Sequence, residues 1–276
     1  MHRTVAPTNR SLLIHYHIFK NAGSTIDFVL QKNFANKFGR LHGNEFNSSL
    51  DASDLLCFLT DRPELQAVSS HHLHPPKPIS DMITFYDILI LRHPIDRLLS
   101  AYDFYRRSSP LNDPVQAAAK NNSFQRFLEC LIVHFPHLIN NAQVNYLGCG
   151  GNKIPREPDL RRALRAIPQF SVVGTVEQLD TVLLTAEVSL SGVFGPLDCS
   201  YMSQNVSPDR APELDQRLRR ARELSGSGLY DRLLKLNRMD LELLEAANQE
   251  SRKRFEVIPD HSARANDFRS RCRALT

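Results

Sequence analysis

A small polar turn, KNAGST at residues 20–25, has the composition of an anion-binding loop. Its small residues allow backbone N–H groups to converge on one point, and Ser24 and Thr25 add hydroxyl donors at the start of the helix expected after them. Free amides and the positive end of a helix dipole suit a phosphate group. Lys20 adds a mobile positive charge beside them. An ordinary strand-to-helix turn with a solvated lysine is the alternative interpretation.

The order of residues in this turn differs from that of the nucleotide-binding loop of ATP and GTP hydrolases. That loop, GxxxxGK[ST], places its lysine after the glycines, whereas Lys20 precedes Gly23. No acidic residue at the end of an expected strand stands out as a magnesium ligand. Both differences weigh against an ATP or GTP hydrolase.

A second segment with anion-binding chemistry is LRHPIDRLLSAY at residues 91–102. Arg92 follows an apolar run expected to be a buried strand, so its guanidinium can reach the same crevice as residues 20–25. Ser100 lies eight residues later, within an expected helix. A planar charged fork and a hydroxyl can bind one phosphate together. A surface arginine is the alternative for Arg92.

Other residues near this helix have less specific interpretations. Arg97 is expected to form a structural ion pair with Asp96 or Asp103. The aromatic residues Tyr102, Phe104 and Tyr105 either shape a ligand pocket or belong to the core. Five arginines are candidates for a groove that binds an acidic ligand, or for solvated helix faces: Arg106, Arg107, Arg161, Arg162 and Arg165.

Three clustered histidines supply a candidate general base. The segment SHHLH contains His71, His72 and His74, and lies between an expected strand and the strand that precedes Arg92. Histidine is the natural proton acceptor near neutral pH. We expect either His72 or His74 to be the base, with His71 third. Solvated loop histidines, or an adventitious metal patch, are the alternative.

The combination of these segments resembles the sulfotransferases that use 3′-phosphoadenosine-5′-phosphosulfate (PAPS), in particular the carbohydrate branch with the heparan sulfate 2-O- and 6-O-sulfotransferases and their bacterial relatives. The resemblance implies that the first loop binds the 5′-phosphosulfate and the second segment the 3′-phosphate. Carried over by motif, the cofactor-binding positions are Lys20, Asn21, Ala22, Gly23, Ser24, Thr25, Arg92 and Ser100. The catalytic positions are Lys20, which neutralises the leaving oxygen, and His72 and His74, which match a His-x-His of the 2-O-sulfotransferases.

The resemblance covers roughly residues 11–240. Weaker similarity continues in NNAQVNYLG at 140–148, FSVVGTVEQLD at 170–180 and LYDRLLKLN at 229–237. The first loop departs from the commoner Pro-Lys-Thr-Gly-Gly-Thr form, because Phe19 stands in place of the proline and Asn21-Ala22 in place of Thr-Gly. This difference affects the assignment to a subfamily more than the assignment of the reaction.

The pattern of apolar residues predicts how these segments are positioned. Short apolar runs predict strands at 11–18, 65–70, 85–91 and 170–174, and helical spacing predicts helices at 26–34, 95–106, 123–135, 177–190, 213–224 and 228–249. We expect residues 107–122 to be a polar loop and the basic tail from residue 251 to be partly disordered. Alternating strands and helices predict a P-loop-like α/β fold, a mostly parallel sheet with helices on both faces. We expect one domain over residues 1–276, with its core at about 11–240.

Composition limits the function classes. A net charge of +4 over 276 residues argues against a nucleic-acid-binding surface. No stretch reaches the length of a membrane span. The five cysteines are scattered and include no CxxC pair, so no zinc site is expected. They favour a reducing, cytoplasmic location over the lumenal part of a Golgi enzyme.

The sequence therefore predicts a sulfotransferase that moves a sulfuryl group from PAPS to a hydroxyl of a carbohydrate or glycolipid acceptor. Its product would be 3′-phosphoadenosine-5′-phosphate (PAP), and no metal is expected. Two alternatives stay open, a P-loop-like nucleotide kinase and a catalytically inactive nucleotide-binding protein on the same fold. The sequence does not indicate an oligomeric state.

Overall fold

The computed structural model describes residues 10–43, 48–110, 113–151, 153–204 and 211–275. Its centre is a parallel sheet of five strands in the order β2-β3-β1-β4-β5. The strands are β1 (Arg10–Tyr16), β2 (Phe38–Arg40), β3 (Ala67–Ser70), β4 (Ile83–Leu91) and β5 (Val172–Thr175). Because β1 has β3 on one side and β4 on the other, the chain reverses its direction of winding at β1. The carboxyl ends of strands at such a point form the crevice where α/β proteins bind ligands.

Alternate residues of the strands face two hydrophobic layers. On one face, Leu13 of β1 packs with helices α1 (Gly23–Phe34), α9 (Leu179–Phe194) and α13 (His261–Arg273). On the other face, Leu12 and Ile14 pack with α2 (Ala52–Thr60), α7 (Ala142–Gly148), α8 (Glu157–Ala166) and α12 (Arg238–Glu256). The sheet is thus covered on both sides, which confirms the predicted α/β class.

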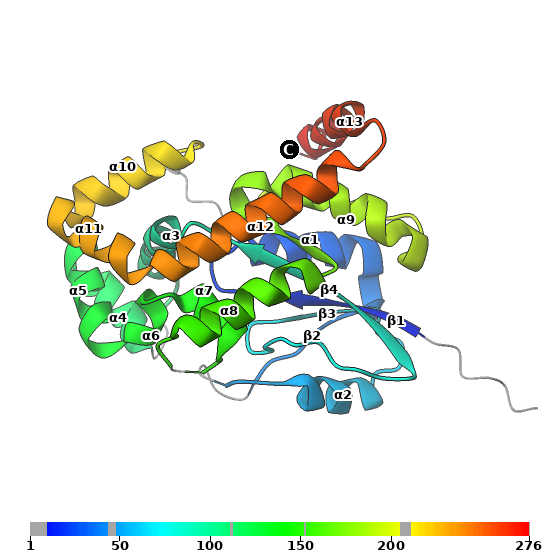
Figure 1. Ribbon diagram of the computed structural model, residues 1–276, viewed down its shortest axis with the longest axis horizontal. Coiled ribbons are helices and arrows are strands. Elements are labelled where there is room, and N and C mark those ends of the chain that lie inside the picture. Colours follow the sequence, from blue (N-terminus) through cyan, green and yellow to red (C-terminus); the bar gives the residue numbers. More distant parts are fainter. Residues whose placement is uncertain (1–9, 44–47, 111–112, 152, 205–210, 276) are drawn as a thin grey trace, which may run out of the picture.

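A third hydrophobic cluster lies beyond the carboxyl ends of the strands. It is built by α3 (Pro94–Arg107), α4 (Pro114–Asn121), α5 (Phe124–His134), α6 (Pro136–Ile139), α10 (Leu214–Ser225) and α11 (Ser227–Leu236). Figure 1 shows these helices gathered at one end of the sheet. They form the side of the crevice that faces the carboxyl ends of the strands. None of the described helices is both long and apolar enough to cross a membrane.

Three expectations from the sequence were wrong. The expected polar loop contains α4, which begins at Pro114 after the cap residue Asp113, whose side chain accepts from the amide of Val115. The single helix expected at 228–249 is two helices, α11 and α12, that meet at the buried Asn237. The tail from residue 251 is helical, because α12 continues to Glu256 and α13 buries Phe268 completely against the sheet layer.

Candidate active site

The turn between β1 and α1 has the backbone geometry of an anion-binding loop. Lys20 and Ala22 both have left-handed backbone angles, with φ of 67° and 61°. Ala22 is the residue before the helix, and no side chain caps it. The amides of Thr25 and Ile26 both donate to the carbonyl of Ala22, at 2.9 and 3.1 Å. The amides of Gly23 and Ser24, just before them, belong to the first turn of the helix, where N–H groups point out of the helix end.

Gly23 is required at the start of α1 for a steric reason that the sequence did not reveal. A Cβ atom at this position would lie 1.8 Å from the ring of His17. That ring is held between two others, with centroids 5.0 Å from His15 and 3.7 Å from His71. The helix therefore begins directly against a stack of imidazoles, and only glycine allows the approach.

Asn21 holds the loop to the rest of the fold. Its side chain is buried, and its amide nitrogen donates to the carbonyl of Ile90 at 2.9 Å and to Oε1 of Gln143 at 2.8 Å. Gln143 in turn accepts from the amide of Arg92 and donates to the Arg92 carbonyl, at 2.9 and 2.8 Å. The Asn21 side chain is thus directed at β4 and α7. Its backbone amide donates to the carbonyl of Ile18 at 3.1 Å, so Asn21 orders the loop from both its backbone and its side chain.

Arg92 holds the loop through the backbone carbonyl of Lys20. Its Nη1 donates to the carbonyl of Lys20 at 2.8 Å, and its Nε donates to the Asp96 carboxylate at 2.7 Å. Arg217 of α10 binds the other oxygen of the same carboxylate at 2.9 Å. Burial alone would raise the pKa of Asp96, but the two arginines hold it below its usual value. Ser100 lies in α3, six residues after the helix begins, and is partly exposed.

The expected ion pair of Arg97 is not formed. Asp96 pairs with Arg92 and Arg217, and Asp103 pairs with Arg220. The Arg97 guanidinium instead donates to a backbone carbonyl, that of Leu138, at 2.7 Å.

Phe19, which stands where the resembling family has proline, positions Lys20 against α3. The Phe19 ring packs against Phe104 and Tyr105, with centroids 5.6 and 5.5 Å away. The Lys20 ammonium lies 4.3 Å from the centre of the Phe104 ring, a distance typical of a cation–π contact. Tyr102 is buried in the third cluster, so the predicted aromatic group divides between ligand pocket and core.

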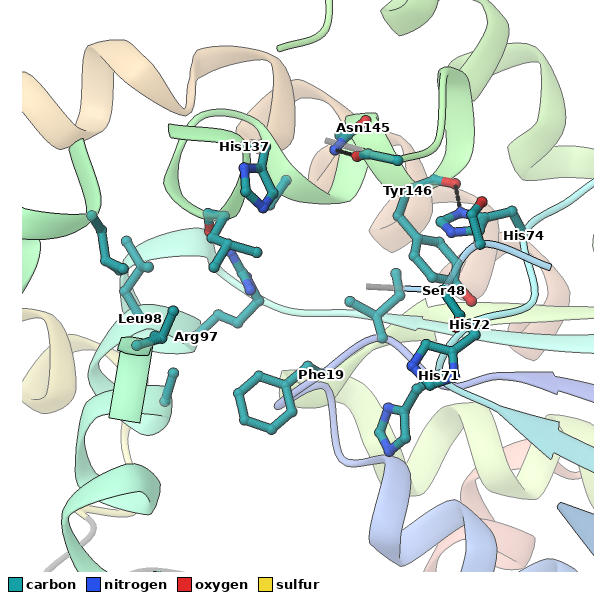
Figure 2. Close-up of a pocket in the computed structure, with 18 of the residues that line it drawn as sticks. Phe19, Ser48, His71, His72, His74, Arg97, Leu98, His137, Asn145 and Tyr146 are labelled. Atoms are coloured by element: carbon teal, nitrogen blue, oxygen red, sulfur yellow. Dashed lines mark hydrogen bonds between the residues drawn. The ribbon is translucent and has the colours of Figure 1, made fainter. Parts of the chain in front are cut away.

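A cavity of about 540 Å³ lies beside this loop. Figure 2 shows the histidines 71, 72 and 74 on one side of it, and Arg97 and Leu98 on the other. Phe19 lies on the floor between them, one residue before Lys20. The cavity therefore joins the three expected base residues to the anion-binding loop.

Hydrogen-bond partners decide which histidine can accept a proton. The Nδ1 of His74 lies 3.0 Å from the carbonyl of Tyr146, and a carbonyl can only accept. The neutral His74 ring therefore carries its hydrogen on Nδ1 and has a lone pair on Nε2. The Nδ1 of His72 lies 2.9 Å from the amide of Gly43, which can only donate. The neutral His72 ring therefore carries its hydrogen on Nε2, which is the wrong state for a base acting from Nε2.

His71 has the same protonation as His74, since its Nδ1 lies 2.9 Å from the carbonyl of His17. It is also more exposed than His74, which is half-buried. Burial lowers the pKa of His74 below its usual value, so its ring is neutral at pH 7. The sequence left His72 and His74 equal. The hydrogen bonds give the protonation of a base acting from Nε2 to His74 and His71, and not to His72.

One group near the loop has the composition of a metal site. His15, His17 and Asp27 are buried within 4.8 Å of one another. The Nδ1 of His15 bonds to Asp27 at 3.0 Å, and Arg40 lies 3.2 Å from the other Asp27 oxygen. Arg40 already supplies a positive charge to this carboxylate. We interpret the group as support for the stack under Gly23.

Comparison with known proteins adds an independent observation. A model of the sulfotransferase family matches residues 2–154, which include the loop, the histidines, Arg92 and Gln143. The chain belongs to the sulfotransferase family. This sulfotransferase is also 28% identical to an uncharacterised protein of Archaeoglobus fulgidus over 244 residues, which are 86% of this chain and 96% of that protein.

Two residues that support the candidate site lie outside the matched segment and were missed from the sequence. Arg217 completes the pairing of Asp96, and Asp240 of α12 accepts from the amides of Gln143 and Val144 at 2.8–3.1 Å. Asp240 could have been noticed in the sequence, because it is an acidic residue next to Met239, among the apolar positions of an expected helix. Such a position indicates a buried carboxylate. Arg217 had no such signal, since α10 contains several arginines.

Proposed function

We propose that this sulfotransferase transfers a sulfuryl group from PAPS to a hydroxyl of a carbohydrate or glycolipid acceptor. The observation that carries the proposal is the start of α1, which no side chain caps, beside a cavity in which His74 has the protonation of a general base. The loop at residues 19–25 contains amides, hydroxyls and an ammonium group but no carboxylate. This set of donors fits a phosphosulfate.

In this proposal the two anion-binding segments hold the two ends of the cofactor. The amides at the start of α1, with Lys20, Ser24 and Thr25, bind the 5′-phosphosulfate. Arg92 and Ser100 bind the 3′-phosphate, and Arg92 has this role in addition to holding the loop. When bound, PAPS supplies the sulfuryl group, and PAP is released once the acceptor oxygen has bonded to sulfur.

The residues of the chain then have separate tasks. Lys20 and the α1 amides stabilise negative charge where the leaving phosphate oxygen lies. His74 accepts the proton of the acceptor hydroxyl at Nε2. The bond from Nδ1 to the Tyr146 carbonyl holds the ring in that orientation and stabilises it once it is protonated.

A second cavity gives room for an extended acceptor. It has a volume of about 680 Å³ and shares Ser49, His74 and Tyr146 with the first. Of the five arginines proposed for an acidic groove, Arg162 and Arg165 line it. This arrangement supports a carbohydrate that extends past His74.

The test is calorimetric titration of the protein with PAP, with ADP and AMP as controls and no magnesium. We expect PAP to bind more tightly than ADP, because the 3′-phosphate contacts Arg92 and Ser100. Equal or tighter binding of ADP would overturn the proposal and favour a nucleotide kinase. Tight PAP binding without turnover of PAPS on a panel of glycans and glycolipids would favour an inactive nucleotide-binding protein.

A single domain and a cytoplasmic location are also part of the proposal. All five cysteines are free, and Cys199 is buried next to Glu187, which together with burial raises the pKa of its thiol to about 12. Unpaired thiols of this kind are typical of proteins from a reducing compartment.

A further inference from the structure

The cavity beside the loop has two chemically different ends. One end contains the histidines and the loop. The other end is a wall of buried apolar side chains from α3, α4 and α5, which include Leu98, Ala101, Val115, Phe127 and Leu131. A pocket for an unmodified sugar needs many polar groups to replace the water bound to its hydroxyls. This wall offers none, so it is suited to an apolar part of a ligand.

Arg97 lines the same end of the cavity. Its side chain is nearly buried, with only 6% of the residue exposed. The guanidinium makes one hydrogen bond, to the Leu138 carbonyl, and its Nε is buried without a partner. Among the residues that the structure describes, no carboxylate lies within ion-pair distance of it.

Two carboxylates could be expected to pair with Arg97, its sequence neighbour Asp96 and Asp240, whose charge acts on it, but both are already bonded elsewhere. Asp96 is held by Arg92 and Arg217. Asp240 attracts Arg97 over a longer distance, but its oxygens accept from the amides of Gln143 and Val144. A guanidinium stays protonated in proteins, so this end of the cavity holds a buried positive charge without a contacting anion. Such a charge is costly to bury unless something pairs with it.

We propose that the acceptor is an amphipathic acid, with a carboxylate that binds Arg97, an apolar body on the α3–α5 wall and the reacting hydroxyl at His74. Figure 2 shows Arg97 and His74 on opposite sides of the cavity, which places the two polar ends of such a molecule apart. The inference rests on the proposed function for the role of the hydroxyl, and narrows the acceptor class within it.

The test uses two probes that differ in one group. The protein, without cofactor, is titrated calorimetrically with 4-methylumbelliferyl β-D-glucuronide, which has an aromatic body, hydroxyls and a carboxylate, and with the neutral 4-methylumbelliferyl β-D-glucoside. We expect the glucuronide to bind roughly 10- to 100-fold more tightly, as one charge-assisted bidentate contact provides. Arg97→Gln should reduce this preference to about twofold or less, because it removes the charge that the carboxylate binds.

Two further variants separate charge from shape. Arg106→Gln changes an exposed arginine of α3 that does not line the cavity, so it should keep the full preference. Ala101→Phe fills the apolar end, and should weaken both probes by tenfold or more while leaving PAP binding unchanged, because Ala101 is outside the proposed cofactor residues.

A wild-type protein that binds the two probes equally would overturn the inference, even if Arg97→Gln does not fold. A preference that survives in Arg97→Gln would also overturn it. PAP binding reports on the proposed function separately. If PAP binds and the probes show no preference, only the acceptor class is wrong. If the preference is present and PAP does not bind, the transfer reaction is wrong and the acid-binding cavity stands.

Discussion

The candidate site has two sides, a donor side around the loop at residues 20–25 and an acceptor side around the cavity. The buried arginine on the donor side is paired with a carboxylate, and, among the described residues, the one on the acceptor side is not. On the donor side, the guanidinium of Arg92 contacts Asp96 and the Lys20 carbonyl, and Arg217 contacts the remaining oxygen of Asp96. On the acceptor side, Arg97 lies five residues further along the same segment and contacts one backbone carbonyl. Both arginines are almost fully buried, so the difference comes from their partners and not from exposure.

This contrast separates preorganisation from recognition. Paired charges around Arg92 fix the loop before any ligand binds, so that no free energy is needed to orient donors during transfer. An unpaired charge at Arg97 leaves an interaction for the ligand to complete. The same helix, α3, therefore supports a rigid donor side and a selective acceptor side.

The largest expected effect comes from the loop lysine. Lys20→Ala should lower single-turnover sulfuryl transfer by roughly 10²- to 10³-fold, because the charge on the leaving phosphate oxygen is no longer stabilised. Rapid-quench measurement with labelled PAPS gives the rate, and Lys37→Ala, at an exposed lysine, is the matched control. An unchanged rate in Lys20→Ala would remove Lys20 from the chemistry.

The histidines test the acceptor side. His74→Ala should slow transfer by roughly 10²- to 10⁴-fold without weakening PAP binding, whereas His72→Ala should cost less than about tenfold. Because the base must be neutral, and burial lowers the His74 pKa, the acidic limb of the wild-type rate should have its midpoint below the ordinary histidine value of about 6.5. The measurement is the pH profile of kcat/KM. An acidic limb at or above pH 6.5, or a larger loss in His72→Ala, would contradict the assignment.

The two arginines provide the sharpest test of the comparison itself. Arg92→Met removes one partner of a buried carboxylate and should lower the free energy of unfolding by about 3 kcal/mol. Arg97→Met removes an unpaired charge and should change the free energy of unfolding by less than about 1 kcal/mol. The loss of one hydrogen bond is offset because a charge no longer has to be buried. Urea unfolding at pH 7 measures both. Equal losses in the two variants would show that Arg97 has a structural partner after all.

The last prediction concerns the start of α1. Gly23→Ala forces the stacked His17 ring to move and should lower the free energy of unfolding by roughly 1–3 kcal/mol. Gly192→Ala, in α9 with open space around the position, should raise it by about 0.4–1 kcal/mol. Thermal unfolding of both variants checks the pair. An unchanged free energy of unfolding in Gly23→Ala would mean that the His17 ring shifts at little cost. The donor side would then be less rigid than its contacts indicate.

Much of the fold was predictable from local patterns. The four strands expected around the site are present at β1, β3, β4 and β5. The helix expected at 123–135 is α5, which Ser123 caps with a hydroxyl that accepts from the amide of Arg126. Short apolar runs and cap residues act through neighbours in the chain, which a sequence displays directly. The helix missed in the polar loop did have a local signal, the cap residue Asp113 before Pro114. The tail helix α13 has no side-chain cap, and it is held by contacts such as that of Phe268 with the sheet layer.

By itself, the sequence determined which groups are near the site: a lysine loop after the first strand, an arginine after the strand expected at 85–91, and histidines between them. It determined this because parallel strands bring their carboxyl ends to one edge of the sheet. Only the tertiary structure decided what each group can do. Arg92 differs from Arg97, and His72 from His74, through partners distant in sequence, such as Arg217 and the Tyr146 carbonyl. Charge pairing and ring protonation depend on atoms within a few ångströms, and no pattern along the chain records those distances.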